Sequence, residues 1–92
     1  MRGDTVIVRA YRGEPLMRRV WDADTRLVYL CSERQFQGLW RGELRVLPPL
    51  GFPREDVFVY DAALLAELEE RWQTDPTVWD RATAWQTEKR GA

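Results

Sequence analysis

The sequence predicts a mainly β (α+β) fold, a small five-stranded antiparallel barrel with a short helical insert and two C-terminal helices. Three observations predict this class. Short β-branched and aromatic runs alternate with turns at the start of the chain, and the apolar period then changes to that of a helix. The chain has only 92 residues, which allow one core. We therefore expect one domain over 1–92, with a barrel over 4–60 and a helical extension over 61–88 packed on it.

The first three strands are expected at 5–11, 16–22 and 26–31. Each is rich in the β-branched and aromatic residues that strands prefer. The run containing Gly13 and the Asp-rich stretch 22–25 are typical of the tight turns between them. The third strand is apolar on both faces, so we expect it to be a central strand. Three consecutive strands with tight turns predict an antiparallel meander.

A short helix is expected over 33–41 as an insert in the barrel. Ser32 and Gln35 have the spacing of a capping box, and Gly42 is a typical residue at a helix end. Phe36, Leu39 and Trp40 then form one apolar face.

The second half of the barrel is expected to begin with a fourth strand over 43–47, which Pro48 and Pro49 end. A single helical turn over 53–56 and a fifth strand over 57–60 should follow.

Two helices are predicted after the barrel. Asp61 is a suitable N-cap for a helix over 62–72, and Asp75 followed by Pro76 indicates the start of another. Each helix has an apolar stripe. The two stripes comprise Leu64, Leu65, Leu68 and Trp72 in the first helix, and Val78, Trp79, Ala82 and Trp85 in the second.

The meander of 5–31 and the segment from Gly51-Phe52-Pro53 to Val57-Phe58-Val59 resemble the Src-homology-three-like small barrels, including their KOW-type and Tudor-type versions. The resemblance is one of fold and covers about residues 4–60. The insert at 33–41 and the extension after residue 61 depart from that pattern. No ligand-binding motif accompanies the resemblance, so it assigns no functional residue.

Composition excludes several function classes. The chain has no His and one Cys, so it lacks the residues of a Ser-His-Asp triad and of a Cys-His zinc site. We expect no metal and no cofactor. A single Cys31 also rules out an internal disulfide, and no run is apolar enough to span a membrane. We therefore expect a cytoplasmic protein without a membrane partner.

Catalysis by carboxylates alone is the remaining enzymatic alternative, and we rank it third. Asp22 and Asp24 lie in a predicted turn, where Asp bonds its own backbone. Glu55 and Asp56 lie in the predicted helical turn, where acidic residues suit the helix dipole. Cys31 lies in the most apolar strand, where a thiol is inert. These local roles explain the residues, so we predict that the protein is not an enzyme.

Nucleic-acid binding is the second hypothesis. Net charge is −1, but residues 1–60 hold ten Arg against eight acidic residues, whereas residues 61–92 total −3. Arginine for phosphate and aromatic rings for bases is the recipe of single-strand binding. The alternative is that these are solvated charges that protect sheet edges. The residues expected on such a surface are Arg12, Arg18, Arg19, Trp21 and Arg45.

Protein binding is the first hypothesis: a non-catalytic adaptor or accessory subunit, with self-association as one form. Trp and Arg dominate interface hot spots, so Trp40 and Arg41 are candidates. The alternative is that Trp40 packs on the barrel with Phe36 and Leu39. Trp79 and Trp85 pose the same choice, because they either close one end of the barrel or present an apolar face to a partner or a second copy.

Overall fold

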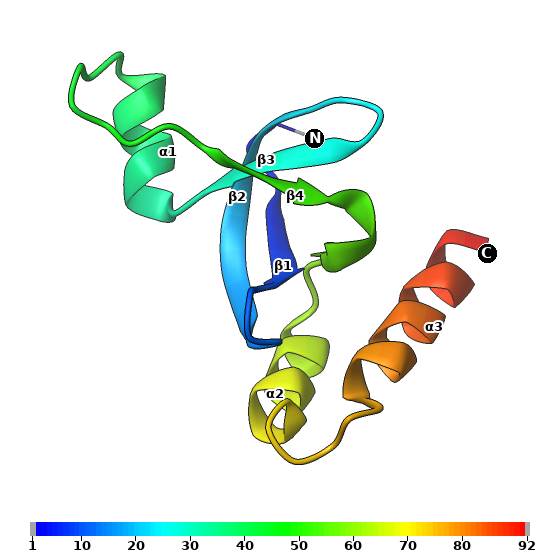
Figure 1. Cartoon of the computed structure of the whole chain (residues 1–92). Helices are drawn as coiled ribbons and strands as arrows, with labels where there is room; N and C mark the ends of the chain where they lie inside the picture. The colour runs from blue at the N-terminus through cyan, green and yellow to red at the C-terminus, as the bar shows by residue number, and fades with distance from the viewer. Residues whose placement is uncertain (1, 92) are drawn as a thin grey trace.

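The computed structural model describes residues 2–91, with side chains up to Glu88 in the last helix. It is a mixed α+β fold with one sheet and three α-helices (Figure 1). The strands are β1 (Thr5–Arg9), β2 (Pro15–Ala23), β3 (Leu27–Cys31), β4 (Leu50–Pro53) and β5 (Val57–Val59), and the helices are α1 (Glu33–Trp40), α2 (Ala62–Arg71) and α3 (Val78–Gly91), with a 3-10 turn η1 (Arg54–Asp56) before β5.

The five strands form one antiparallel sheet in the order β4-β3-β2-β1-β5. The expected β1–β3 meander and the helical turn before the last strand are both present. The sheet is not closed, because no ladder joins the edge strands β4 and β5 within residues 2–91. The prediction of a closed barrel is therefore not confirmed, and the architecture is an open, curved sheet. The β2–β3 register shifts between Val20 and Asp22, which makes Trp21 a bulged residue.

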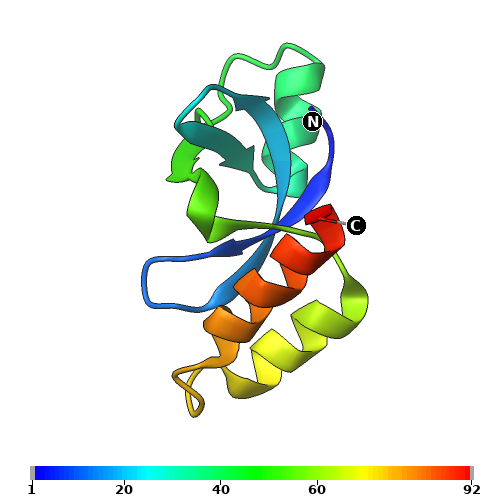
Figure 2. The same ribbon diagram turned by 90° about the vertical axis from the view of Figure 1, so that its right-hand side faces the viewer.

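The two faces of the sheet build two apolar clusters. On β1, Ile7 faces one cluster, whereas Val6 and Val8 face the other, as strand alternation requires. The first cluster is completed by Phe58, Leu64, Leu68, Val78, Trp79 and Ala82. The second contains Val20, Val28, Leu30 and Val57. Figure 2 shows α2 and α3 lying side by side against the sheet, where the first cluster forms. The helices are therefore part of the core.

Helix α1 lies at the opposite end of the molecule from α2 and α3 (Figure 1). Its capping box is formed as predicted, because the Ser32 hydroxyl accepts from the Gln35 N–H and the Gln35 side chain accepts from the Ser32 N–H. Gly42 follows the helix with φ +75°, the left-handed conformation typical of a glycine helix stop.

The predicted fourth strand over 43–47 is wrong. That segment is irregular and folds back on α1, where Val46 lies against Gly38. The strand is Leu50–Pro53. It contains a glycine and a proline, which strands disfavour, so the sequence did not indicate a strand here. Gly51 lets the side chains of Leu27 and Tyr29 pack closely, since an added Cβ would lie 3.1 Å from Leu27 and 3.2 Å from Tyr29.

The C-terminal helices differ from prediction mainly at one boundary. Asp61 caps α2 as expected, by accepting from the Leu64 N–H at 2.9 Å. Helix α3 begins at Val78 rather than after Asp75, because the Asp75 carboxylate bonds the N–H and hydroxyl of Thr77 and holds residues 75–77 as a turn. Within residues 2–91, no helix is long and apolar enough to cross a membrane.

Candidate interaction surface

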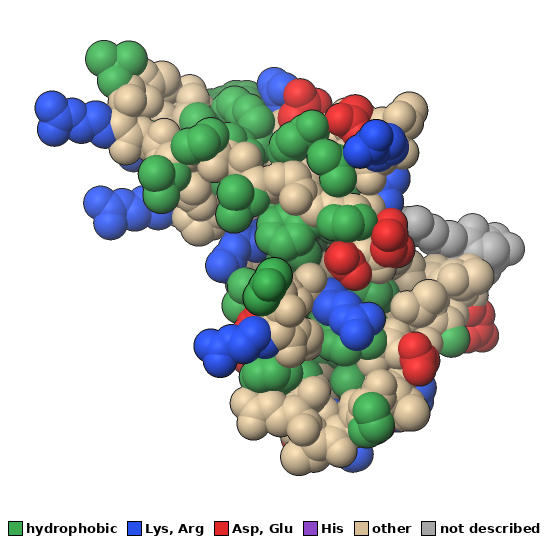
Figure 3. All heavy atoms as spheres, viewed as in Figure 1, with side chains coloured by type: hydrophobic (Ala, Val, Ile, Leu, Met, Phe, Trp, Pro, Cys, Tyr) green, Lys and Arg blue, Asp and Glu red, His purple; other side chains and the backbone are tan. Residues whose placement is uncertain are grey.

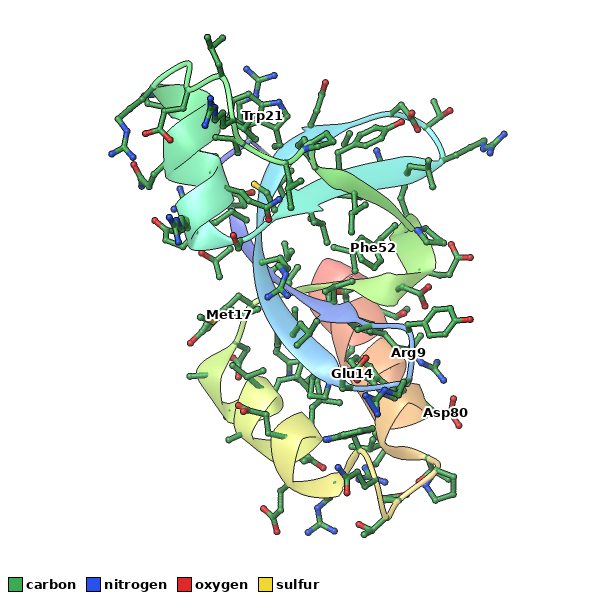
Figure 4. All side chains as sticks on the ribbon, turned by 60° about the vertical axis from the view of Figure 1, so that its left-hand side comes forward. Arg9, Glu14, Met17, Trp21, Phe52 and Asp80 are labelled. Atoms are coloured by element: carbon green, nitrogen blue, oxygen red, sulfur yellow. The ribbon has the colours of Figure 1, made fainter. Side chains whose placement is uncertain are left out.

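Three aromatic rings form a continuous stack at the α1 end of the sheet. The Trp21 ring contacts Phe36 edge-on, with 5.8 Å between the ring centroids. Phe36 stacks on Trp40 with 6.1 Å between the centroids and 13° between the ring planes. Phe36 and Trp40 are one helical turn apart on α1, so their spacing places them on one face. The bulge in β2 brings Trp21 to the same place, and Figure 4 shows Trp21 beside α1.

Two arginines hold this stack. The Arg19 guanidinium lies 4.0 Å from the Phe36 centroid, and it also donates to the Gly3 carbonyl at 2.7 Å and to Glu33 at 2.6 Å. Arg2 lies over the Trp21 ring at 5.0 Å and donates to the Trp21 carbonyl at 2.7 Å. Glu33 is an acceptor for Gln37 and Arg19, and these bonds lower the pKa of its carboxyl. These contacts hold the Trp21 and Phe36 rings in place, and Trp40 lies on Phe36.

The outer end of the stack is open to solvent. Phe36 is buried, but Trp40 is 66% exposed. Arg2, Phe36, Gln37 and Trp40 line a shallow hollow of about 390 Å³, which we call the Trp40 surface. The sequence left open whether Trp40 packs on the sheet; only Phe36 does, and Trp40 rests on it with most of its indole free. Arg41, the neighbouring candidate, is exposed and pairs with Glu43 at 2.9 Å.

Trp79 and Trp85 do not belong to this surface, because they lie on α3 at the other end. Trp79 is 5% exposed, packs against Phe58 at 5.2 Å, and donates its indole N–H to the Gly13 carbonyl at 2.7 Å. Its assignment as a partner-binding residue is therefore corrected to a core role. Trp85 is half-buried against the same cluster.

The residues proposed for nucleic-acid binding are not brought together. Arg12 lies at the β1–β2 turn beside Glu14, whereas Arg45 lies in the α1–β4 connection at the far end of the sheet (Figure 1). Arg18 donates to the Met17 carbonyl, and Arg19 and Trp21 are used in the aromatic stack. No single face gathers the predicted set.

A second hollow was missed by sequence reasoning. It lies between the β1–β2 turn and η1 and has a volume of about 590 Å³. Arg9 and Phe52 lie on this side in Figure 4, and Tyr11 at its rim is fully exposed. Its residues are Arg9, Ala10, Tyr11, Arg12, Gly13, Phe52, Pro53 and Asp56. The only available signal was an aromatic residue at the end of the predicted first strand, Tyr11 next to Arg12.

Titratable groups are occupied by structural roles. Cys31 is 2% exposed, and burial raises the pKa of its thiol. The Asp24 carboxylate accepts from the backbone N–H groups of Leu27 and Arg26, which lower its pKa, and it thereby orders the β2–β3 turn. Among the residues described, no three Cys, Asp or Glu side chains gather as a metal site.

Comparison with known proteins gives no relative: no protein-family model, no curated protein and no solved structure matches this chain.

Proposed function

We propose that the protein is a non-catalytic interaction module that binds another protein through the Trp40 surface. One observation supports this above the others: Trp40 is 66% exposed, although it is stacked on a buried ring. Most of the indole lies outside the core in this position, so the domain itself gains only the contact with Phe36 from it. The same indole offers a partner a large exposed apolar area that is supported from below by the Phe36 ring.

The composition of the Trp40 surface suits a protein ligand. Trp and Arg are the residues most enriched at hot spots, and Arg2 lies at the edge of the same hollow as Trp40. The stack on Phe36 and the cation over Trp21 orient both groups. We further propose that the open sheet is related to the Src-homology-three-like small barrels, supported by the 3-10 turn between β4 and β5, and that the protein acts in the cytoplasm.

The test compares capture by three forms of the tagged protein in lysate of its host, with quantitative mass spectrometry. Wild type should retain a partner that Trp40→Ala loses, and a partner identified in this way should bind the variant more weakly by roughly 30-fold, the effect of a hot spot of about 2 kcal/mol. Tyr11→Ala is the matched control, since Tyr11 is an exposed aromatic residue in the other hollow.

Retention of every specific partner by Trp40→Ala would overturn the proposal. Loss through Tyr11→Ala alone would transfer the binding function to the hollow between the β1–β2 turn and η1.

A further inference from the structure

The connection between α1 and β4 presents exposed apolar side chains, of which Leu44, which we call the knob, is the most exposed. Leu44 lies in a turn at 44–45 and is 99% exposed, so it takes no part in the core. Its neighbours in the chain are Glu43, which pairs with Arg41, and Arg45, and residues 34–49 contain three Arg and one Glu. Figure 3 shows hydrophobic side chains on this part of the surface, with Lys or Arg side chains at its margin. An exposed leucine beside cationic residues is suited to an apolar hole with an acidic rim.

The same molecule has such a hole at its other end. A hollow of about 170 Å³ lies between α2 and α3. Leu64, Val78, Ala82 and Trp85 supply its apolar part, and Asp61 and Glu67 its acidic part. Its volume is close to that of an apolar cavity of ~150 Å³ that accommodates benzene. Benzene is larger than the side chain of leucine, so a leucine side chain fits in the hollow.

Charge favours the same pairing. Helix α2 with its N-cap, residues 61–71, has four acidic residues and one Arg. Arg81 also lines the hollow and pairs with Glu67 at 3.1 Å and with Asp75 at 2.9 Å, so these three side chains together carry one net negative charge. Glu69 and Glu70 are exposed on α2. Arg45 is exposed in the same turn as Leu44, so this cation can approach an acidic surface.

We propose that a second copy of this chain occupies the hollow: Leu44 of one copy enters the α2–α3 hollow of the next, with Arg45 facing the acidic surface of α2. Knob and hole lie at opposite ends of the molecule (Figure 1). The contact is therefore heterologous, which leaves a free knob and a free hole after each addition and extends into a chain or a ring. It uses neither Trp40 nor Arg2, so it goes beyond the proposed function.

Two variants with complementary defects test this assembly by light scattering coupled to size exclusion, at low salt and over a range of protein concentrations. Leu44→Asp removes the knob and keeps the hole, whereas Ala63→Arg blocks the hole and keeps the knob. Both positions are exposed, so the thermal midpoints should not change. The matched controls are Tyr11→Asp, an exposed turn position elsewhere, and Ala66→Arg, an exposed α2 position outside the hollow.

We expect wild type and both controls to exceed the monomer mass of 10.9 kDa as concentration rises. Each blocked variant alone should remain monomeric. An equimolar mixture of the two should form a dimer and nothing larger, because only one knob and one hole remain functional. The oligomers should dissociate as salt rises. A monomeric wild type, or two blocked variants that fail to combine, would overturn the proposal. Trp40→Ala should assemble normally, so failure here leaves the function proposed for Trp40 untouched.

Discussion

The side-chain amide of Gln86 on α3 bonds the free edge of β5 at two points. Its oxygen accepts from the backbone N–H of Val59, and its nitrogen donates to the backbone carbonyl of Val57 at 3.3 Å. An unpaired strand edge is a template for pairing with another chain, and proteins commonly cover it. A single glutamine here satisfies one donor and one acceptor of the last strand.

Replacing Gln86 should therefore loosen β5. We expect Gln86→Ala to lower the free energy of unfolding by about 0.5–1.5 kcal/mol, since one or two hydrogen bonds are exchanged for water. Urea denaturation measures the loss, and amide hydrogen exchange at Val59 should become faster. Thr87→Ala is the control, because Thr87 is exposed on the same helix. Equal exchange rates at Val59 in all three proteins would contradict the edge role.

Trp79 and Trp40 should respond oppositely to truncation. Trp79→Ala should cost about 3–5 kcal/mol, because it leaves a cavity against Phe58 and an unpaired Gly13 carbonyl. Trp40→Ala should cost no more than about 0.5–1.5 kcal/mol, the worth of one aromatic contact. Urea titrations of both variants measure this difference, and comparable losses would show that Trp40 is a core residue.

Gly38 allows the α1–β4 connection to lie against α1. A Cβ at position 38 would lie 2.5 Å from a methyl group of Val46, so Gly38→Ala should destabilise wild type by roughly 1–3 kcal/mol. The clash disappears in a Val46→Ala background. There, the same substitution should stabilise the protein by roughly 0.5–1 kcal/mol, because alanine is the better helix former. A double-mutant cycle reveals the change of sign.

The Asp75 carboxylate makes the free energy of unfolding depend on pH in the acid range. Hydrogen bonds from the hydroxyl and N–H of Thr77 and from Arg81 lower its pKa from 3.8 to about 2. The unfolded chain binds the proton first as the pH falls, so this stabilisation is complete above the unfolded pKa and is lost toward pH 2. Asp75→Asn should be less stable than wild type at pH 6, and the difference should shrink as the pH approaches 2. Asp80→Asn controls for the removal of a charge from the same region.

The sequence predicted the elements whose signals are local. The capping box at Ser32, the N-cap at Asp61 and most of the apolar stripes of the two last helices are found in the structure, and each signal lies within a few residues. Trp72 is the exception, because it is the C-cap of α2 and does not belong to the core cluster. The fourth strand was misplaced because its position depends on distant contacts. Residues 43–47 have the composition of a strand, but this segment folds back on α1 beside Gly38, and the strand that pairs with β3 is Leu50–Pro53.

The candidate surface was predictable only in part, because the sequence shows its local spacing but not its long-range contacts. Helical spacing placed Phe36 and Trp40 on one face, but it did not reveal which of the two is buried. No periodicity encodes the bulge at Trp21. Nor does it encode the position of Arg2 over the Trp21 ring, because these two residues are 19 positions apart. Trp79 had the same composition signal as Trp40, and only its contacts with Gly13 and Phe58 distinguish it.

The alternation of Ile7 with Val6 and Val8 makes β1 a wall shared by both apolar clusters. Neither cluster can lose its packing without disturbing the strand that supports the other. The helices and the sheet should therefore unfold in a single cooperative transition. Cleavage of the backbone after residue 60 would consequently leave no stable half. A protease that cleaves the loop before α2 should therefore cause the whole domain to unfold and be degraded, without a stable intermediate fragment.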